Sequence, residues 1–160
     1  MLASFLQSLT TSILALFRQD ANFKNTLPLH DYHGFQKARI PSATLAAIAA
    51  AHTVNPDELQ AEWVVVTQDL LSEIHCHLRS RAYCIVMGAA EHVPDPARAF
   101  VFLHDAWTPV AAGQTIDIPP AAAHGFTIRS GGTLHFLSVQ TPPIESAAGD
   151  DYEKVLCIKS

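Results

Sequence analysis

The sequence has no cluster of lysine and arginine residues. It contains 10 basic and 15 acidic residues, so its formal net charge at pH 7 is -5. A protein that binds nucleic acid needs a basic stripe to neutralise the phosphates. The charge pattern therefore argues against nucleic acid as a partner.

Cysteine is also scarce. The chain has three cysteines, Cys76, Cys84 and Cys157, and none of them belongs to a CxxC pair. An odd number without a disulfide framework is typical of free thiols in a reducing compartment. We therefore expect a cytoplasmic protein, although these residues alone leave other compartments open.

A long apolar run is missing as well. The most apolar stretch, residues 1–17, includes hydroxyl and amide side chains and is followed by Arg18. No basic residue precedes it, as a secretory signal would require. Its apolar residues follow a helical spacing and predict an amphipathic helix over 3–17, packed on its own domain or on a partner subunit. A helix in the membrane interface is disfavoured because its basic face is missing, so we expect no membrane association.

The first part of the chain is expected to be helical. After a polar connector at 18–34, the stretch ATLAAIAAA follows Ser42, a plausible N-cap, and predicts a helix over 43–51. Asn55 and Pro56 open a further helical segment over 56–61. We therefore expect residues 1–62 to form an N-terminal helical extension.

The pattern changes at Trp63. From there the sequence consists of short β-type runs separated by turn residues at fairly regular intervals. This arrangement is typical of an all-β sandwich or barrel. We therefore predict a mainly β fold, with residues 63–160 forming a barrel and a C-terminal strand or tail on which the helical extension packs.

Two histidines lie one residue apart in the run SEIHCHLRSRAYCIVMG, residues 72–88. Side chains alternate across a strand, so His75 and His77 share a face and can converge on one ion. A third ligand must come from elsewhere in the chain. His124 is the candidate, because it begins a β-type run just after the Pro119-Pro120 turn.

Residues 63–143 resemble a cupin, a small jelly-roll barrel whose patterns are G(x)5HxH(x)3–4E(x)6G and G(x)5PxG(x)2H(x)3N. The histidines and the positions of Gly88, Gly113 and Pro119 match. Four positions depart from the patterns: Asp69 and Ala121 replace glycines, Ile128 replaces the final asparagine, and Arg81 replaces the glutamate. The resemblance implies a jelly-roll barrel with one divalent transition metal ion held by His75, His77 and His124.

Arg81 replaces the residue that usually supplies the fourth ligand in cupins, so the resemblance implies a three-histidine site. Neutral imidazoles suit Fe, Zn or Ni, among other divalent ions. Some cupins with three histidines are dioxygenases, and we expect a metal-dependent dioxygenase acting on a small organic molecule. The alternatives are a non-catalytic or sensory small-ligand-binding cupin, a metal-dependent isomerase or cyclase, and histidines with a structural role only.

Continued alternation along the strands predicts which side chains line the pocket. Arg81 and Tyr83 are then expected to face inward as catalytic and substrate-binding residues. Alternatively, Arg81 pairs with Glu73, Glu91 or Asp105, or leaves the barrel through the LRSR turn. The remaining expected substrate-binding residues make an apolar pocket; they are Met87, Phe126 and Ile128.

Three further expectations concern neighbouring histidines, an acid and the assembly. His104 and His135 lie in β-type runs and could line the pocket, and Glu73 could contact the metal from the rim. The apolar stripe at the N-terminus and the open sheet edges of a cupin predict a homodimer.

Overall fold

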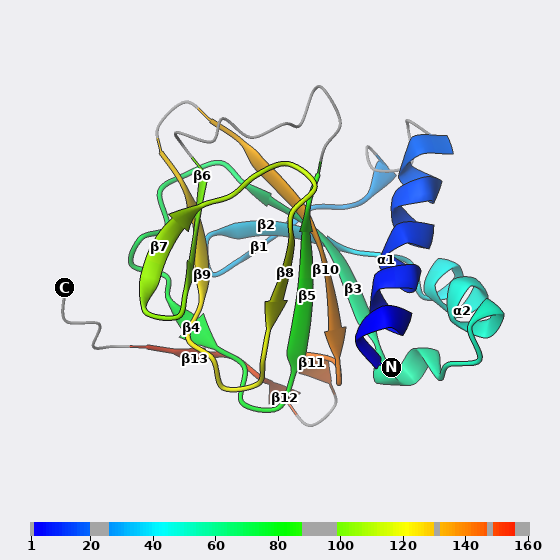
Figure 1. Cartoon of the computed structure of the whole chain (residues 1–160). Helices are drawn as coiled ribbons and strands as arrows, with labels where there is room; N and C mark the ends of the chain where they lie inside the picture. Colours follow the sequence, from blue (N-terminus) through cyan, green and yellow to red (C-terminus); the bar gives the residue numbers. More distant parts are fainter. Residues whose placement is uncertain (1, 20–25, 88–98, 130–131, 147–148, 156–160) are drawn as a thin grey trace.

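The computed structural model describes residues 2–19, 26–87, 99–129, 132–146 and 149–155 (Figure 1). Its elements are, in chain order, α1 (Leu2–Gln19), β1 (His30–Tyr32), β2 (Phe35–Arg39), α2 (Ser42–Ala51), the 3-10 helix η2 (Pro56–Glu58), β3 (Gln60–Val66), β4 (His75–Cys76), β5 (Arg81–Val86), β6 (Ala99–Leu103), β7 (Ala106–Pro109), β8 (Thr115–Ile118), β9 (Gly125–Ile128), β10 (Leu134–Thr141), β11 (Glu145–Ser146), β12 (Gly149–Asp150) and β13 (Glu153–Lys154).

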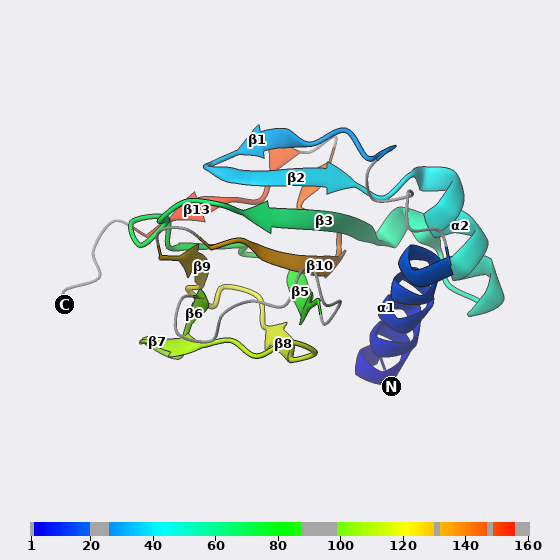
Figure 2. The ribbon, with the colours of Figure 1, turned by 90° about the horizontal axis from the view of Figure 1, so that it is seen from above.

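Two antiparallel walls form the barrel (Figure 2). The larger is a six-stranded sheet in the order β1-β2-β3-β10-β5-β8, and the smaller is a three-stranded sheet in the order β7-β6-β9. The short pair β4–β13 continues the smaller wall, because a backbone bridge joins His75 of β4 to His124 beside β9. The prediction of a mainly β, cupin-like barrel preceded by helices is confirmed.

Alternation along the central strands separates two apolar clusters. On β3, Trp63 and Val65 point to the outer face of the large sheet, whereas Val64 and Val66 point into the barrel. The outer cluster packs under the helices, and the inner cluster fills the space between the two walls. A strand buried on both faces explains why β3 is apolar almost throughout.

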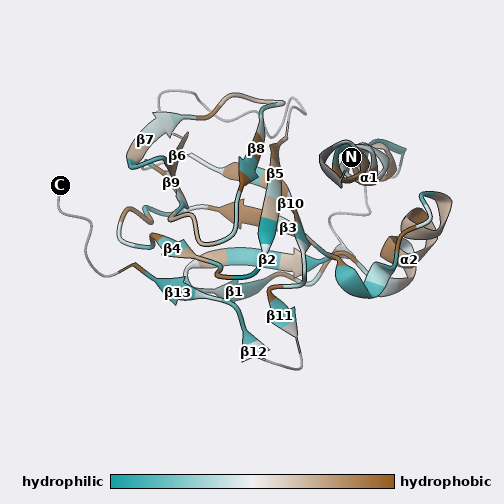
Figure 3. Ribbon diagram, turned by 60° about the horizontal axis from the view of Figure 1, so that its bottom comes forward, coloured by the Kyte–Doolittle hydropathy of each residue, from teal (hydrophilic) through white to brown (hydrophobic). Residues whose placement is uncertain are grey.

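Helix α1 covers the outer face of the large sheet beside α2 (Figure 1, Figure 3). Leu6, Leu9 and Ile13 are fully buried, and they belong to the same cluster as Trp63 and Leu137. The expected amphipathic stripe therefore packs against its own chain. None of the helices in the described part of the chain combines the length and apolar character that crossing a membrane requires.

The N-terminal half contains more strand than expected. Residues 30–32 and 35–39 form β1 and β2, which extend the large sheet, where the sequence suggested a helical extension over 1–62 with a polar connector at 18–34. The expected helix over 56–61 is only a 3-10 turn, capped by Asn55, before β3 starts at Gln60. Pro41, not Ser42, holds the N-cap position of α2. Gly88 of the cupin pattern lies outside the described residues.

Candidate metal centre

Three buried histidines meet at one point of the barrel wall. The ring nitrogens of His75, His77 and His124 that face one another all lie within 4.8 Å. Backbone hydrogen bonds of 2.9 and 2.8 Å, donated in each direction between His75 and His124, set these two residues side by side. His77 joins them because it follows His75 by two positions. The predicted set is therefore brought together, in positions suited to one metal ion.

The backbone assigns the tautomer of each ring. The Nδ1 atoms of His75 and His124 contact the carbonyl oxygens of Glu73 and Ala122 at 3.1 and 2.9 Å, and Nδ1 of His77 contacts the carbonyl of Asp151. A carbonyl can only accept, so each Nδ1 carries the proton and each Nε2 keeps a free lone pair. Metal-ligating histidines are commonly oriented by such partners. The three rings therefore fit a metal ion.

Burial keeps these rings uncharged. It lowers the pKa of His75 well below 6.5, and the neighbouring histidines lower it further. Burial also lowers the pKa of His124, to about 4, and that of His77, where contacts with Asp151 partly oppose the effect. All three imidazoles are therefore neutral at pH 7, which is the state that binds a metal.

The C-terminal segment supports the strand that carries two of these histidines. Strand β13 pairs with β4, with Lys154 opposite His75 and Glu153 opposite Cys76. The ring of Tyr152 stacks on His75 with a centroid distance of 4.5 Å. A segment almost 80 residues away in the sequence therefore covers the histidine strand.

Asp151 makes the most extensive of these contacts. Its carboxylate accepts hydrogen bonds from the backbone N–H groups of Leu78, Arg79 and Ser80, at 2.9, 2.9 and 3.0 Å. Burial alone would raise the pKa of Asp151, but these backbone hydrogen bonds lower it overall. Through its carbonyl the same residue also orients His77. Asp151 thus fixes both the ring of His77 and the turn that follows it.

The histidines open onto a cavity of about 60 Å³ inside the barrel. One part of its wall is apolar and another part is polar. The lining residues are Tyr32, Phe35, Lys37, Glu62, Val64, His75, His77, Ala82, Cys84, Ile118, His124, Phe126, Phe136, Ser138, Gln140 and Ile144. Apolar and polar side chains contribute to the wall in similar numbers, so the cavity combines apolar surface with polar groups as small-molecule sites do, at a volume that admits only a small molecule or part of one.

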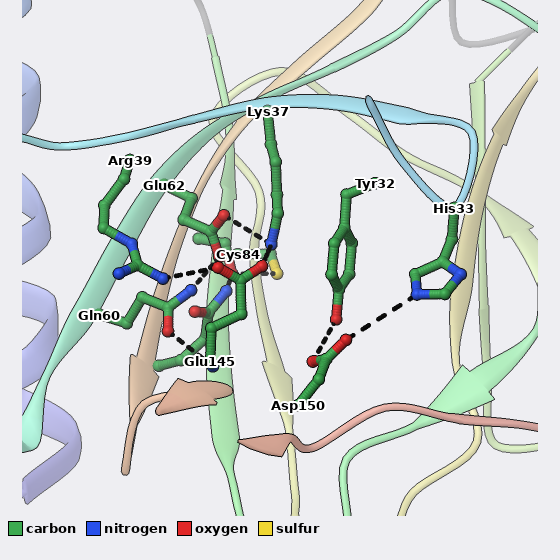
Figure 4. Close-up of polar contacts among 11 residues, drawn as sticks. Tyr32, His33, Lys37, Arg39, Gln60, Glu62, Cys84, Glu145 and Asp150 are labelled. Carbon is green, nitrogen blue, oxygen red and sulfur yellow. Dashed lines mark hydrogen bonds and ion pairs between the residues drawn. The ribbon is translucent and has the colours of Figure 1, made fainter. Parts of the chain in front are cut away.

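A buried lysine organises the polar part of the cavity (Figure 4). The ammonium of Lys37 lies 2.8 Å from a carboxylate oxygen of Glu62 and 2.8 Å from one of Glu145. It also lies 3.4 Å from the ring centroid of Tyr32, in cation–π contact. Lys37 and Glu62 are only 4% and 1% exposed, so this is a buried ion pair.

Tyr32 carries a second polar contact at the cavity. Its hydroxyl donates a 2.6 Å hydrogen bond to Asp150, which also lies near His33 (Figure 4). Burial, followed by the hydrogen bond to Asp150, raises the pKa of Tyr32. The phenol therefore stays protonated at neutral pH.

Arg81 and Tyr83 lie elsewhere than expected. Arg81 leaves the barrel and pairs with Asp117 on the neighbouring strand, at 3.3 Å. Tyr83 and Met87 belong to the outer cluster under the helices. The expected inward orientation of all three was wrong, because the turn at 78–80 shifts the alternation between β4 and β5 by one residue. For Arg81 the structure instead shows the alternative, in which its side chain leaves the barrel, although its partner is Asp117 and not one of the acids considered.

The other expected pocket residues divide into two groups. Phe126 lines the cavity, and Ile128 is buried in the inner cluster without being part of the cavity wall. Glu73 pairs with Lys154 at 3.0 Å, and its carbonyl contacts His75 Nδ1, so it supports a histidine of the cluster without belonging to the cluster. His104 lies exposed in the turn after β6.

His135 packs against Trp63, at 5.4 Å between ring centroids, and is not part of the cavity wall. The expected places of His104 and His135 in the pocket are therefore not found among the described residues.

Sequence reasoning missed the polar cavity residues Tyr32, Lys37, Glu62, Ser138 and Gln140. A signal exists in two strands. On the inward face of β3, Gln60 and Glu62 precede two valines, and on that of β10 Ser138 and Gln140 follow Phe136. The inward face of each strand is therefore polar at one end and apolar at the other. Because the two strands are antiparallel, their polar ends lie together and indicate a polar end of the barrel interior.

Comparison with solved structures gives the fold. The polyketide cyclase RemF from Streptomyces resistomycificus aligns with a TM-score of 0.56 and 16% identity, over 74% of this chain and 76% of that one. An RmlC-like cupin from Shewanella frigidimarina aligns with a TM-score of 0.52 and 18% identity, over 77% and 90%. The chain has a cupin fold.

The Streptomyces nucleoside dehydratase Pac13 aligns with this cupin fold at a TM-score of 0.55 and 13% identity, over 82% of this chain and 86% of that one. A structure of that protein contains uridine. No protein-family model matches the chain, and no curated protein sequence matches it. At these identities the similarity establishes the fold alone.

Proposed function

We propose that this cupin is a metal-dependent enzyme that converts a small organic molecule without oxidising it, as a cyclase, dehydratase or isomerase. The observation that carries the proposal is that the histidine cluster and a buried polar cluster line one cavity. Such reactions need both an electrophile at a substrate oxygen and groups that hold protons nearby.

Each part of the cavity then has a role. His75, His77 and His124 would hold a divalent ion such as Zn, Fe or Ni through Nε2. A bound ion supplies Lewis acidity toward a substrate oxygen. Tyr32 Oη and Lys37 Nζ hold protons at the cavity wall.

The apolar walls exclude water from the reacting molecule. Phe35, Phe126 and Phe136 contribute aromatic surface to the cavity, and the rings of Phe126 and Phe136 stack at 4.3 Å. A dry wall strengthens polar contacts with the substrate. Two proteins of similar fold are named as a polyketide cyclase and a nucleoside dehydratase, which are the types of reaction proposed here.

A dioxygenase is the second candidate, and it is supported by the kinds of atom that would bind the metal. Only nitrogen donors meet in the cluster, and no carboxylate among the described residues joins them. Three protein ligands leave positions for both substrate and oxygen at an iron or nickel ion. The resemblance of the histidine pattern to that of some cupin dioxygenases supports the same candidate.

One experiment separates the candidates. Untagged full-length protein is analysed for metals and then incubated with a pool of small metabolites, with mass spectrometry and an oxygen electrode as readouts. The proposal expects a substrate that is lost to a cyclised, dehydrated or isomeric product without oxygen uptake, and a loss of turnover on chelation. Oxygen uptake matched to substrate loss would establish the dioxygenase, and binding without turnover would establish a ligand-binding protein.

A homodimer and a cytoplasmic location stay predictions. The apolar stripe of α1 is already buried within the chain, through Leu6, Leu9 and Ile13. The argument for a dimer therefore now depends on the sheet edges rather than on this helix.

A further inference from the structure

The polar part of the cavity wall carries no unbalanced charge among the described residues. We call Lys37, Glu62, Ser138 and Gln140 the polar wall, since all four line the cavity. The ammonium of Lys37 lies between two carboxylates, and the second oxygen of Glu62 accepts from Gln60 at 2.6 Å. The positive charges of Lys37 and Arg39 balance the negative charges of Glu62 and Glu145. A charged ligand would find no free counter-ion there.

Gln140 has an unused acceptor in this wall. Gln140 is 4% exposed, and its Nε2 donates to Ser138 Oγ at 2.8 Å. Its Oε1 is buried and has no hydrogen-bond partner in the described part of the chain. A buried acceptor without a partner is costly, so such an atom usually marks a place for a bound water or ligand.

Gln140 lies in the wall of the cavity that also contains the histidines. It comes from β10, where it lies opposite Ala82 of β5, and both residues line the cavity that also holds the histidines. Phe136 and Val64 line the same space with apolar surface. Gln140 therefore belongs to the same wall as the histidines and this apolar surface.

We propose that the cavity binds a small molecule whose hydroxyl or amide N–H donates a hydrogen bond to Gln140 Oε1 and whose part in contact with the polar wall carries no charge. Gln140 is then the residue that selects the ligand by its donor. This inference deepens the proposed function, on which the role of the histidines rests, by naming the substrate class. It also replaces the substrate-binding role expected for Arg81, because Arg81 lies outside the barrel beside Asp117.

The test uses two probes that differ in one group, phenol and its methyl ether, anisole. Their affinities are measured by NMR titration of the full chain, both as purified and after chelation of metals. Wild-type protein should bind phenol at least tenfold more tightly than anisole, with shifts at the Gln140 side-chain amide. The Gln140→Leu variant should lose about tenfold in phenol affinity and keep that for anisole.

The control is Gln36→Leu, on β2, whose amide binds Asp31 and does not line the cavity. It should bind both probes as wild type does. Equal phenol affinity in Gln140→Leu and wild type, equal affinity of wild type for the two probes, or no binding of phenol at millimolar concentration would each overturn the proposal. The comparison of probes on wild type does not depend on the variant folding.

Zinc titration of the same proteins keeps this result apart from the proposed function. Gln140→Leu should bind zinc as wild type does, since its side chain is not one of the cluster. If wild type prefers phenol to anisole but does not bind zinc, the metal proposal fails while the proposed binding site at Gln140, which we call the subsite, is supported. If zinc binds and the selectivity is missing, the subsite fails alone.

Discussion

At the scale of single residues, Ala121 is one of the four departures from the cupin pattern, and its backbone conformation shows what the replacement of glycine costs. It occupies the position of a pattern glycine, and its φ of 64° lies in the left-handed region that an L side chain disfavours. Its N–H donates to the carbonyl of His77 at 2.7 Å, which ties the turn to the histidine strand. The chain therefore keeps the conformation of the glycine at a cost in strain.

Ala121→Gly should relieve this strain. We expect the free energy of unfolding to rise by about 0.5–1 kcal/mol, measured by urea denaturation. The control is Ala122→Gly, whose backbone is not in the left-handed region. That variant should be neutral or destabilised, and a loss of stability in Ala121→Gly would contradict the account.

The lowered pKa of Glu145 predicts that the free energy of unfolding depends on pH. Burial alone would raise its pKa, but its hydrogen bond to Lys37 and the charges of Lys37 and Arg39 lower it below 4.5. The native state thus favours the charged form, and its stabilisation is present above the unfolded pKa and lost as pH falls through the lower folded value.

Below about pH 4.5, wild type should therefore lose stability more steeply than Glu145→Gln, which has no carboxylate to protonate. Thermal unfolding between pH 3 and pH 7 measures the difference. Parallel curves for the two proteins would show that Glu145 makes no such contribution.

At the scale of elements, the turn between β4 and β5 shows what the sequence could and could not predict. His75 and His77 were recognisable because alternation within one short strand is local. The orientation of Arg81 was not, because Asp151 holds residues 78–80 in a turn that shifts the alternation, and it lies more than 70 positions away. Lys37 was missed because a lysine in a short strand is usually exposed.

Asp151 should matter for both the turn and the metal site. Asp151→Ala leaves three buried or partly buried N–H groups without their acceptor, which should destabilise the fold by about 1–3 kcal/mol and weaken zinc binding. Urea denaturation and zinc competition with a chelator measure the two effects. Glu153→Gln, at an exposed position on β13, should change neither. Unchanged zinc affinity in Asp151→Ala would refute the supporting role of this segment.

The junction of β2 with β3 supplies a further prediction. Lys37→Met leaves Glu62, which is 1% exposed, without its cation, so unfolding should become easier by about 3–5 kcal/mol. Arg39→Met removes a cation that is 48% exposed and should cost at most about 1 kcal/mol. Equal losses in urea denaturation would contradict the buried ion pair.

At the scale of the whole molecule, the two walls of the barrel contribute different parts of the structure. The large sheet has α1 and α2 on its outer side and the smaller wall on its inner side (Figure 2). The cavity lies on the inner side. The smaller wall, continued by β4 and β13, brings the three histidines together. The barrel could be predicted from the β-type runs, whereas β1 and β2 lack enough apolar alternation to reveal themselves.

The central claim is that His75, His77 and His124 hold one metal ion, and zinc binding measured with a chelator competitor at pH 7 tests it most directly. Full-length wild type should bind one zinc ion per chain, and His77→Ala should bind well below one. His104→Ala, changed at an exposed turn, should match wild type. Full retention of zinc by His77→Ala would contradict the account.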